Sequence, residues 1–146
     1  MAKPICMIID GSSLTYRAFY ALPLLTDAAG RYTNAVYGLS TMLLRLLGEW
    51  QPQQLVVAFD KGKHTFRNEV YGDYKAHRKA TPVELVEQFP RVRELATAFG
   101  AAVLEQEGYE ADDIIGRVSR DAAQEGLDVL IVTGDRDALQ LVDPSV

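Results

Sequence analysis

Hydrophobic residues in this chain form short uninterrupted runs that alternate with longer amphipathic stretches. A short apolar run bounded by turn residues is typical of a buried strand, and apolar residues recurring every three or four positions are typical of a helix with one buried face. The runs predict strands over residues 5–9, 55–59, 101–104 and 129–132. The amphipathic stretches predict helices over residues 13–21, 35–50, 82–99, 110–124 and 136–141.

Local signals refine the ends of these helices. The longest, 35–50, stops before Pro52, and its apolar residues at helical spacing share one face: Val36, Leu39, Leu43, Leu46 and Leu47. The segment from Thr81 to Glu84 reads as a capping box with proline at the first helical position. The helix behind it is expected to kink or break near Pro90 and to end at Gly100.

Alternating strands and helices predict the fold class. Right-handed strand–helix–strand units build a parallel sheet with helices on both faces. We therefore expect an α/β three-layer sandwich with a mostly parallel central sheet. A chain of 146 residues is of a size that forms one domain, which we expect to span residues 1–146.

The composition and the N-terminal residues predict the cellular compartment of the protein. No apolar run approaches the roughly 20 residues of a membrane span, and the N-terminus leads directly into the first strand, which leaves no room for a signal peptide. The single cysteine, Cys6, lies in that strand and can form no internal disulfide. We read Cys6 as a core residue and expect a cytoplasmic protein without a membrane partner.

Candidate chemistry is concentrated in acidic residues at or near strand ends. Three of them directly follow hydrophobic runs or the turns that close those runs, and the others stand at a helix start or beside the last turn. The seven are Asp10, Asp60, Glu110, Asp112, Asp113, Asp135 and Asp137. Parallel sheets bind ligands outside the carboxyl ends of their strands, so the fold would gather these acids at one edge.

Each acid also has an ordinary structural explanation. Asp10 could be a turn residue, Asp135 could cap a helix, and the acids at 110–113 could favour a helix start. Their joint placement is better explained by a shared metal site. Oxygen ligands without a matching histidine or cysteine favour Mg²⁺ or Mn²⁺ over zinc, and two such ions can catalyse phosphoryl transfer. A P-loop motif is absent, and a response-regulator receiver needs fewer acids and no basic arm.

A basic segment lies beside the acids in sequence. The chain has a net charge of −5, yet residues 61–79 hold six lysines and arginines against two acids. Cations interleaved with aromatic residues suit single-stranded nucleic acid, since cations hold phosphates while a ring stacks on a base. The candidate contacts are Lys61, Lys63, Arg67, Tyr74, Lys75 and Arg78. A solvated helical face is the alternative, and His64 and His77 read as bystanders or weak phosphate contacts.

Five spaced motifs carry a family resemblance over essentially the whole chain. They are Asp10-Gly11-Ser12-Ser13 with Tyr16-Arg17-Ala18, Phe59-Asp60 with Thr65-Phe66-Arg67, Tyr74-Lys75-x-His77-Arg78, Glu110-Ala111-Asp112-Asp113 and Gly134-Asp135-x-Asp137. In this order they resemble the 5′-nuclease domains of bacterial DNA polymerase I, members of the flap endonuclease group with a PIN-like fold.

The resemblance implies Mg²⁺-dependent hydrolysis of DNA phosphodiester bonds at 5′ ends and 5′ flaps, in replication and repair, with Mn²⁺ as a substitute. By motif match the seven acids form the metal-binding set, and Asp112 and Asp135 are central to catalysis. Residues 61–80 become a helical arch in which Lys75 and Arg78 steady the scissile phosphate and Tyr74 stacks on the terminal base. Arg17 is a further phosphate contact.

The family also has a C-terminal helix–hairpin region that grips duplex DNA and supplies further carboxylates, and this chain ends before it. We therefore expect the N-terminal catalytic half, with one metal site well supplied and the second under-liganded. A polymerase domain could share the native chain. Two alternatives remain: a catalytically silent module that binds metal and DNA structures, and a PIN-type ribonuclease.

Overall fold

The computed structural model of this chain describes residues 3–60, 81–105 and 110–134. These residues form a four-stranded sheet in the order β3-β2-β1-β4. The strands are β1 (Ile5–Asp10), β2 (Gln54–Ala58), β3 (Ala102–Leu104) and β4 (Asp128–Val132), and all the pairings between them are parallel. The predicted strands are thus confirmed within one residue, and their carboxyl ends share one edge.

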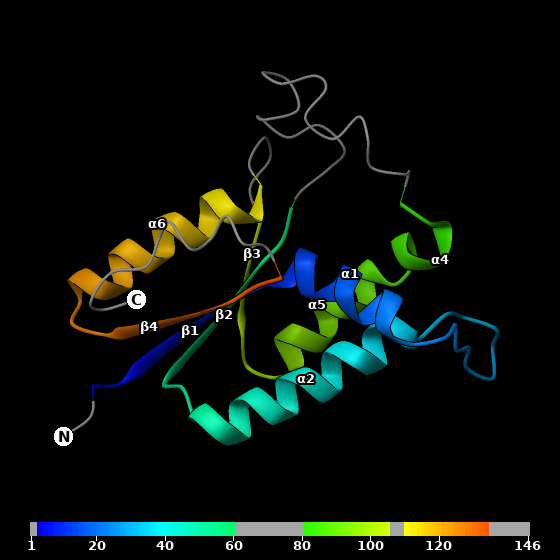
Figure 1. Ribbon diagram of the computed structural model, residues 1–146, viewed down its shortest axis with the longest axis horizontal. Coiled ribbons are helices and arrows are strands. Elements are labelled where there is room, and N and C mark those ends of the chain that lie inside the picture. Colours follow the sequence, from blue (N-terminus) through cyan, green and yellow to red (C-terminus); the bar gives the residue numbers. More distant parts are fainter. Residues whose placement is uncertain (1–2, 61–80, 106–109, 135–146) are drawn as a thin grey trace, which may run out of the picture.

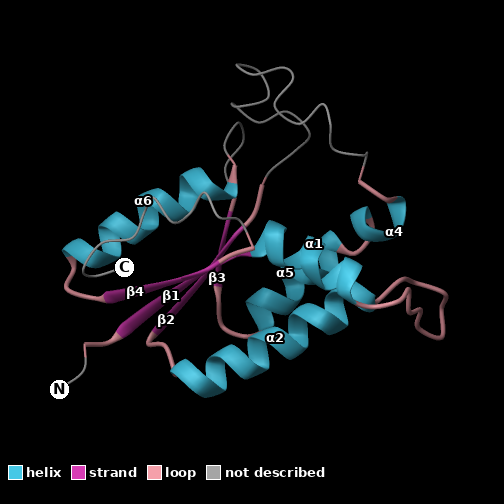
Figure 2. Ribbon diagram, in the orientation of Figure 1, coloured by secondary structure: helices cyan, strands magenta, loops and turns pink. Residues whose placement is uncertain are grey.

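Helices cover both faces of the sheet, as Figures 1 and 2 show. One face carries α6 (Ala111–Gln124), and the other carries α1 (Gly11–Ala21), α2 (Asn34–Trp50) and α5 (Phe89–Ala98). The alternation along β1 explains the two layers, because Cys6 and Ile8 pack towards α6 while Met7 and Ile9 pack towards the other helices. The three-layer α/β sandwich is confirmed.

Within the described residues, the helices predicted over 13–21, 35–50, 82–99 and 110–124 are found within two residues of their predicted ends, apart from the capping of one start. The face of α2 is as expected, with Leu39 and Leu43 fully buried. The capping box at Thr81 is wrong: α4 (Val83–Val86) begins after Pro82, which is its N-cap, and no side chain caps it. The Thr81 hydroxyl is instead hydrogen-bonded to Tyr16 on α1, so a tertiary contact replaces the local one. The break before α5 is confirmed, with proline in its first turn.

A buried amide pair joins three helices on the α1 side. Gln88 accepts hydrogen bonds from the N–H groups of Ala35 and Val36 (2.8 and 3.2 Å) at the start of α2. Gln88 also donates to Asn34 Oδ1 (2.9 Å), and Asn34 donates to the Phe19 carbonyl near the end of α1 (2.9 Å). Both side chains are fully buried. Because buried polar groups must be paired, this network fixes how α1, α2 and the segment before α5 meet.

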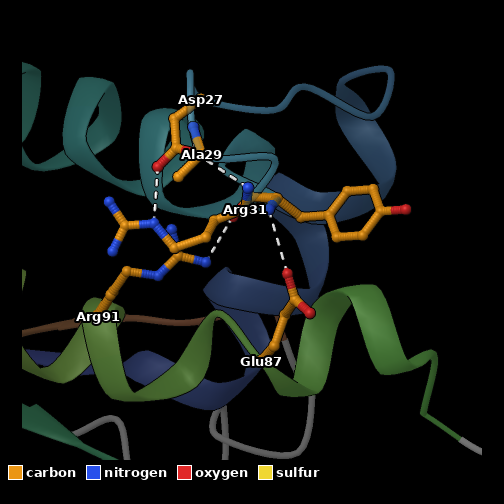
Figure 3. A network of polar contacts seen from close by, with 6 residues as sticks. Asp27, Ala29, Arg31, Glu87 and Arg91 are labelled. Atoms are coloured by element: carbon orange, nitrogen blue, oxygen red, sulfur yellow. Dashed lines mark hydrogen bonds and ion pairs between the residues drawn. The ribbon is translucent and has the colours of Figure 1, made fainter.

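The loop from α1 to α2 is held by a second set of polar contacts, shown in Figure 3. Asp27 accepts from the N–H groups of Ala29 and Arg31 and pairs with the Arg31 guanidinium (2.8 Å). Glu87 accepts the Tyr32 N–H (3.1 Å), and Arg91 donates to the Tyr32 carbonyl (2.6 Å). The loop is therefore attached to α5 and to the segment before it.

No described helix is both long enough and apolar enough to cross a bilayer. Cys6 is buried in β1, as expected of a core residue, and burial raises the pKa of its thiol. The helix predicted over residues 136–141 lies outside the described residues, as does the proposed arch over residues 61–80.

A candidate metal centre at the carboxyl edge of the sheet

Asp10 is the most deeply buried acid at this edge. It ends β1 and is the N-cap of α1, where its Oδ1 accepts the Ser13 N–H (3.1 Å). Its Oδ2 accepts a hydrogen bond from the Thr133 hydroxyl after β4 (3.0 Å). Only 3% of Asp10 is exposed. Burial raises its pKa above the usual value, the hydrogen bonds from Ser13 and Thr133 oppose that rise, and the negative charge of Asp60 adds to it.

Asp60 connects the end of β2 to the start of α6. Its backbone N–H donates to Ser12 Oγ (2.9 Å), and its Oδ1 accepts the N–H of Ala111 (2.6 Å). A carboxylate at a helix N-terminus is stabilised by unpaired N–H groups and by the helix dipole. Asp60 is thereby aimed at the first turn of α6, where the next acids lie.

The remaining described acids are in that first turn. Glu110 is 5% exposed and is the N-cap of α6. It forms a reciprocal capping box with Asp113, whose Oδ2 accepts the Glu110 N–H (3.1 Å). Asp112 is half-buried beside them. The alternative explanation, that these acids stabilise the start of a helix, therefore holds for Glu110 and Asp113. It does not exclude binding of a metal ion, because a carboxylate that caps a helix retains further lone pairs.

Hydroxyl groups tie these acids to the end of β4. Ser13 Oγ accepts the N–H of Gly134 (3.0 Å) and lies 3.3 Å from Thr133 Oγ1. The sequence placed Ser12 and Ser13 in a motif but predicted no contact for either of them, and it predicted no role for Thr133. The signal that could have found them is a hydroxyl residue within three positions of a strand-end acid, where it can reach the carboxylate or the neighbouring backbone.

A described arginine at the same edge was also missed. The Arg93 guanidinium carbon lies 5.0 Å from the ring centre of Phe59 and 5.8 Å from that of Phe89. Its Nη2 is 3.2 Å from Glu105 Oε2, just after β3. Arg93 therefore supports the residue immediately before Asp60 by stacking on its ring. Sequence alone could not separate half-buried Arg93 from the exposed cations of the helices.

The other predicted site residues are not brought into this cluster by the described part of the chain. Arg17 is exposed on α1, two turns beyond Asp10. Eight candidates lie outside the described residues: Lys61, Lys63, Arg67, Tyr74, Lys75, Arg78, Asp135 and Asp137. The described acids are Asp10 and Asp60 at strand ends and Glu110, Asp112 and Asp113 at the start of α6. Their convergence into one metal site stays a prediction.

The donor chemistry of this edge suits a hard divalent cation. The ligand atoms are carboxylate oxygens, and among the residues that the structure describes no lysine or arginine is paired with Asp10 or Asp60. The same described residues contain no group of three acids, histidines or cysteines arranged closely enough to hold an ion together. Gly134, the last described residue, donates its N–H to Ser13 Oγ beside Asp10, and Asp135 follows it directly in the sequence.

Comparison with known proteins identifies relatives of this chain. Residues 5–146 match the family model for the 5′-3′ exonuclease, N-terminal resolvase-like domain. The chain is 53% identical to DNA polymerase I of Bacillus caldotenax over 140 residues, covering 96% of this chain and 16% of that protein. It is 50% identical to DNA polymerase I of Streptococcus pneumoniae over 147 residues, covering 98% and 17%. The chain thus spans about a sixth of the length of these relatives.

Solved structures share the fold. The bacteriophage T5 5′-exonuclease with bound divalent metal ions (zinc) has a TM-score of 0.75 at 22% identity, covering 97% of this chain and 53% of that one. A complex of the T5 flap endonuclease with DNA and metal ions has a TM-score of 0.69 at 23% identity, with the same coverage. The catalytic core of Rad2 with a DNA substrate has a TM-score of 0.56 at 18% identity, covering 94% and 41%. These likenesses support the PIN-like architecture.

Proposed function

We propose that this chain, which belongs to the family of 5′-3′ exonuclease N-terminal domains, hydrolyses DNA phosphodiester bonds at 5′ ends and 5′ flaps with the help of divalent cations. One observation supports the proposal: Asp10 is buried at the end of β1, and Asp60, after β2, accepts the backbone N–H of Ala111 at the start of α6, where further acids lie. Relatives named DNA polymerase I and fold neighbours that bind metal ions and DNA support it.

The chain's own residues would hold the cations at this edge. Asp10, Asp60, Glu110, Asp112 and Asp113 supply oxygen ligands, joined by Asp135 and Asp137 from the next part of the chain. The ion we propose is Mg²⁺, with Mn²⁺ as a substitute, because all these ligands are carboxylates. When bound, such cations polarise the scissile phosphate and activate water for in-line attack.

Cationic residues would hold the substrate. We assign Lys75 and Arg78 to the scissile phosphate, where they offset the charge that develops during hydrolysis. Tyr74 would stack on the terminal base, while Arg17, Lys61, Lys63 and Arg67 contact the strand that carries the 5′ end. The native partners are then branched or 5′-flap DNA and, given the length of the relatives, a polymerase domain in the same chain.

A labelled 5′-flap duplex tests the proposal. The chain is incubated with the flap and with Mg²⁺, Mn²⁺ or EDTA, and the products are sized on a gel; Asp112→Asn is the inactive comparison. Metal-dependent release of the labelled flap by the wild type and not by the variant supports the assignment. Equal cleavage by both would refute the role of Asp112, and binding of the flap without cleavage would favour the silent DNA-binding module. Cleavage of RNA in preference to the flap would favour a ribonuclease.

A further inference from the structure

The two described residues that flank the basic segment are bonded to the same helix. Asp60, the last described residue before the segment, donates its N–H to Ser12 Oγ (2.9 Å). Thr81, the first described residue after it, is hydrogen-bonded through its hydroxyl to the hydroxyl of Tyr16. Ser12 and Tyr16 are four residues apart, so they lie one turn apart on the same face of α1, at a separation of roughly 6 Å along the axis.

The surroundings of both anchors are fixed. Ser12 is 7% exposed, and the next residue bonds to Asp10 and Gly134. The Tyr16 ring packs against Phe89, with ring centres 6.2 Å apart, and against the small core formed by Phe19, Ala35 and Leu85. Its hydroxyl is therefore held in place by a ring that cannot move freely.

From this arrangement we infer that Tyr16 and Ser12 are positioning residues, which set where the basic segment leaves and rejoins the fold. The helix bonded to both flanking residues begins directly after Asp10, its N-cap. One helix thus links Asp60 and Thr81 to the most buried described acid of the candidate metal centre. The consequence for catalysis, the alignment of Lys75 and Arg78 with the acids, rests on the proposed function.

Tyr16 is the better anchor to test, because Tyr16→Phe keeps the ring and removes only the hydroxyl. The matched control is Tyr20→Phe, one turn further along α1, whose side chain is 67% exposed. Thr81→Val removes the same hydrogen bond from the other side. If the Tyr16–Thr81 bond is the anchor, the double variant is no worse than either single variant.

Amide hydrogen exchange measures the anchor without any need for activity. The N–H groups of Leu85 and Val86 both bond to the Pro82 carbonyl, directly after Thr81, and the Val92 N–H bonds to Gln88 in α5. We expect Tyr16→Phe and Thr81→Val to speed exchange at Leu85 and Val86 about fivefold, the effect of losing one hydrogen bond. Exchange at Val92 stays unchanged. Unchanged exchange at Leu85 and Val86, or an equal increase at Val92, overturns the inference.

Flap cleavage then tests the catalytic consequence. A misplacement of catalytic groups by about 1 Å can slow catalysis by up to roughly 10²-fold. Because Tyr16→Phe removes only one anchoring bond, we expect a smaller loss, with kcat lowered about tenfold and KM little changed. Tyr20→Phe keeps both constants. An unchanged kcat in Tyr16→Phe refutes the positioning role. Absence of cleavage by the wild type would instead contradict the proposed function, while the exchange measurement still decides whether Tyr16 anchors the segment.

Discussion

Thr133 Oγ1 donates a hydrogen bond to Asp10 Oδ2 over 3.0 Å, which joins the ends of the two neighbouring strands β1 and β4. The bond does two things at once. It favours the ionised form of a buried carboxylate, because a donor stabilises negative charge. It also orients the one acid that caps α1, so that the side chain cannot rotate away from the edge where the other acids lie.

Replacing Thr133 by valine keeps the shape of the side chain and removes this donor. The pKa of Asp10 should then rise further, because burial is opposed by one hydrogen bond fewer. We expect the chain to need more divalent cation for half-maximal flap cleavage, by a factor of about 10, as is typical when a residue behind a metal ligand is lost. A metal titration of the cleavage rate measures this. Thr97→Val, on the exposed side of α5, is the control and should titrate like the wild type.

Asp10→Asn should stabilise the fold while abolishing cleavage. Burial raises the folded-state pKa of Asp10 above the unfolded value of about 3.8, so the folded state binds more protons between these two values. Stability therefore falls as the pH rises from about 3.8 through the folded pKa, and this loss persists at neutral pH. The amide still accepts the Ser13 N–H and carries no charge. We expect the variant to be more stable than the wild type at pH 7 without metal, because the cost of the buried charge is removed.

Thermal unfolding at several pH values measures that gain. The difference between Asp10→Asn and the wild type should shrink towards zero as the pH falls below about 3.8. Adding Mg²⁺ or Mn²⁺ should raise the Tm of the wild type and leave that of the variant nearly unchanged, because a ligand stabilises only the state that binds it. A wild type that is more stable than the variant at pH 7 without metal would contradict the cost assigned to the buried charge.

Two variants of Asp60 separate its capping role from its metal role. Asp60→Asn retains an oxygen that can accept the Ala111 N–H, whereas Asp60→Ala leaves that N–H without its acceptor. Both should lose cleavage. Only Asp60→Ala should lose about 1 kcal/mol of stability, the usual cost of removing a helix cap, as measured by urea unfolding. Equal stability of the two variants would show that the 2.6 Å bond adds nothing to the fold.

Sequence predicted the sheet and the two helical layers, because both follow from local patterns such as the apolar run before Asp10, while the gathering of all seven acids at one metal site stays a prediction. It missed what depends on tertiary contacts. Thr81 looked like a local cap because its spacing to Glu84 is right, yet its hydroxyl bonds to a tyrosine 65 positions earlier in the chain. Thr133 bonds to Asp10, 123 positions earlier in the chain, and Arg93 stacks on Phe59, which follows a different element, β2. No periodicity marks either residue.

Gly11 is likewise required by a tertiary contact that its local sequence does not show. A side chain at Gly11 would place its Cβ 2.6 Å from a ring carbon of Phe59 and 2.7 Å from Val57. Both neighbours are buried in the core between β2 and α1, so neither can move aside cheaply. Gly11→Ala should therefore destabilise the fold by roughly 1–3 kcal/mol, the usual cost of overpacking. It should also reduce flap cleavage, since the helix cap at Asp10 and the residue before Asp60 are forced apart.

The matched control is Gly48→Ala, in α2, where nothing lies within 4 Å of the added Cβ. This variant should instead stabilise the chain by about 0.5–1 kcal/mol. Urea unfolding of the two variants measures both effects, and a neutral Gly11→Ala would mean that α1 and β2 can separate without cost.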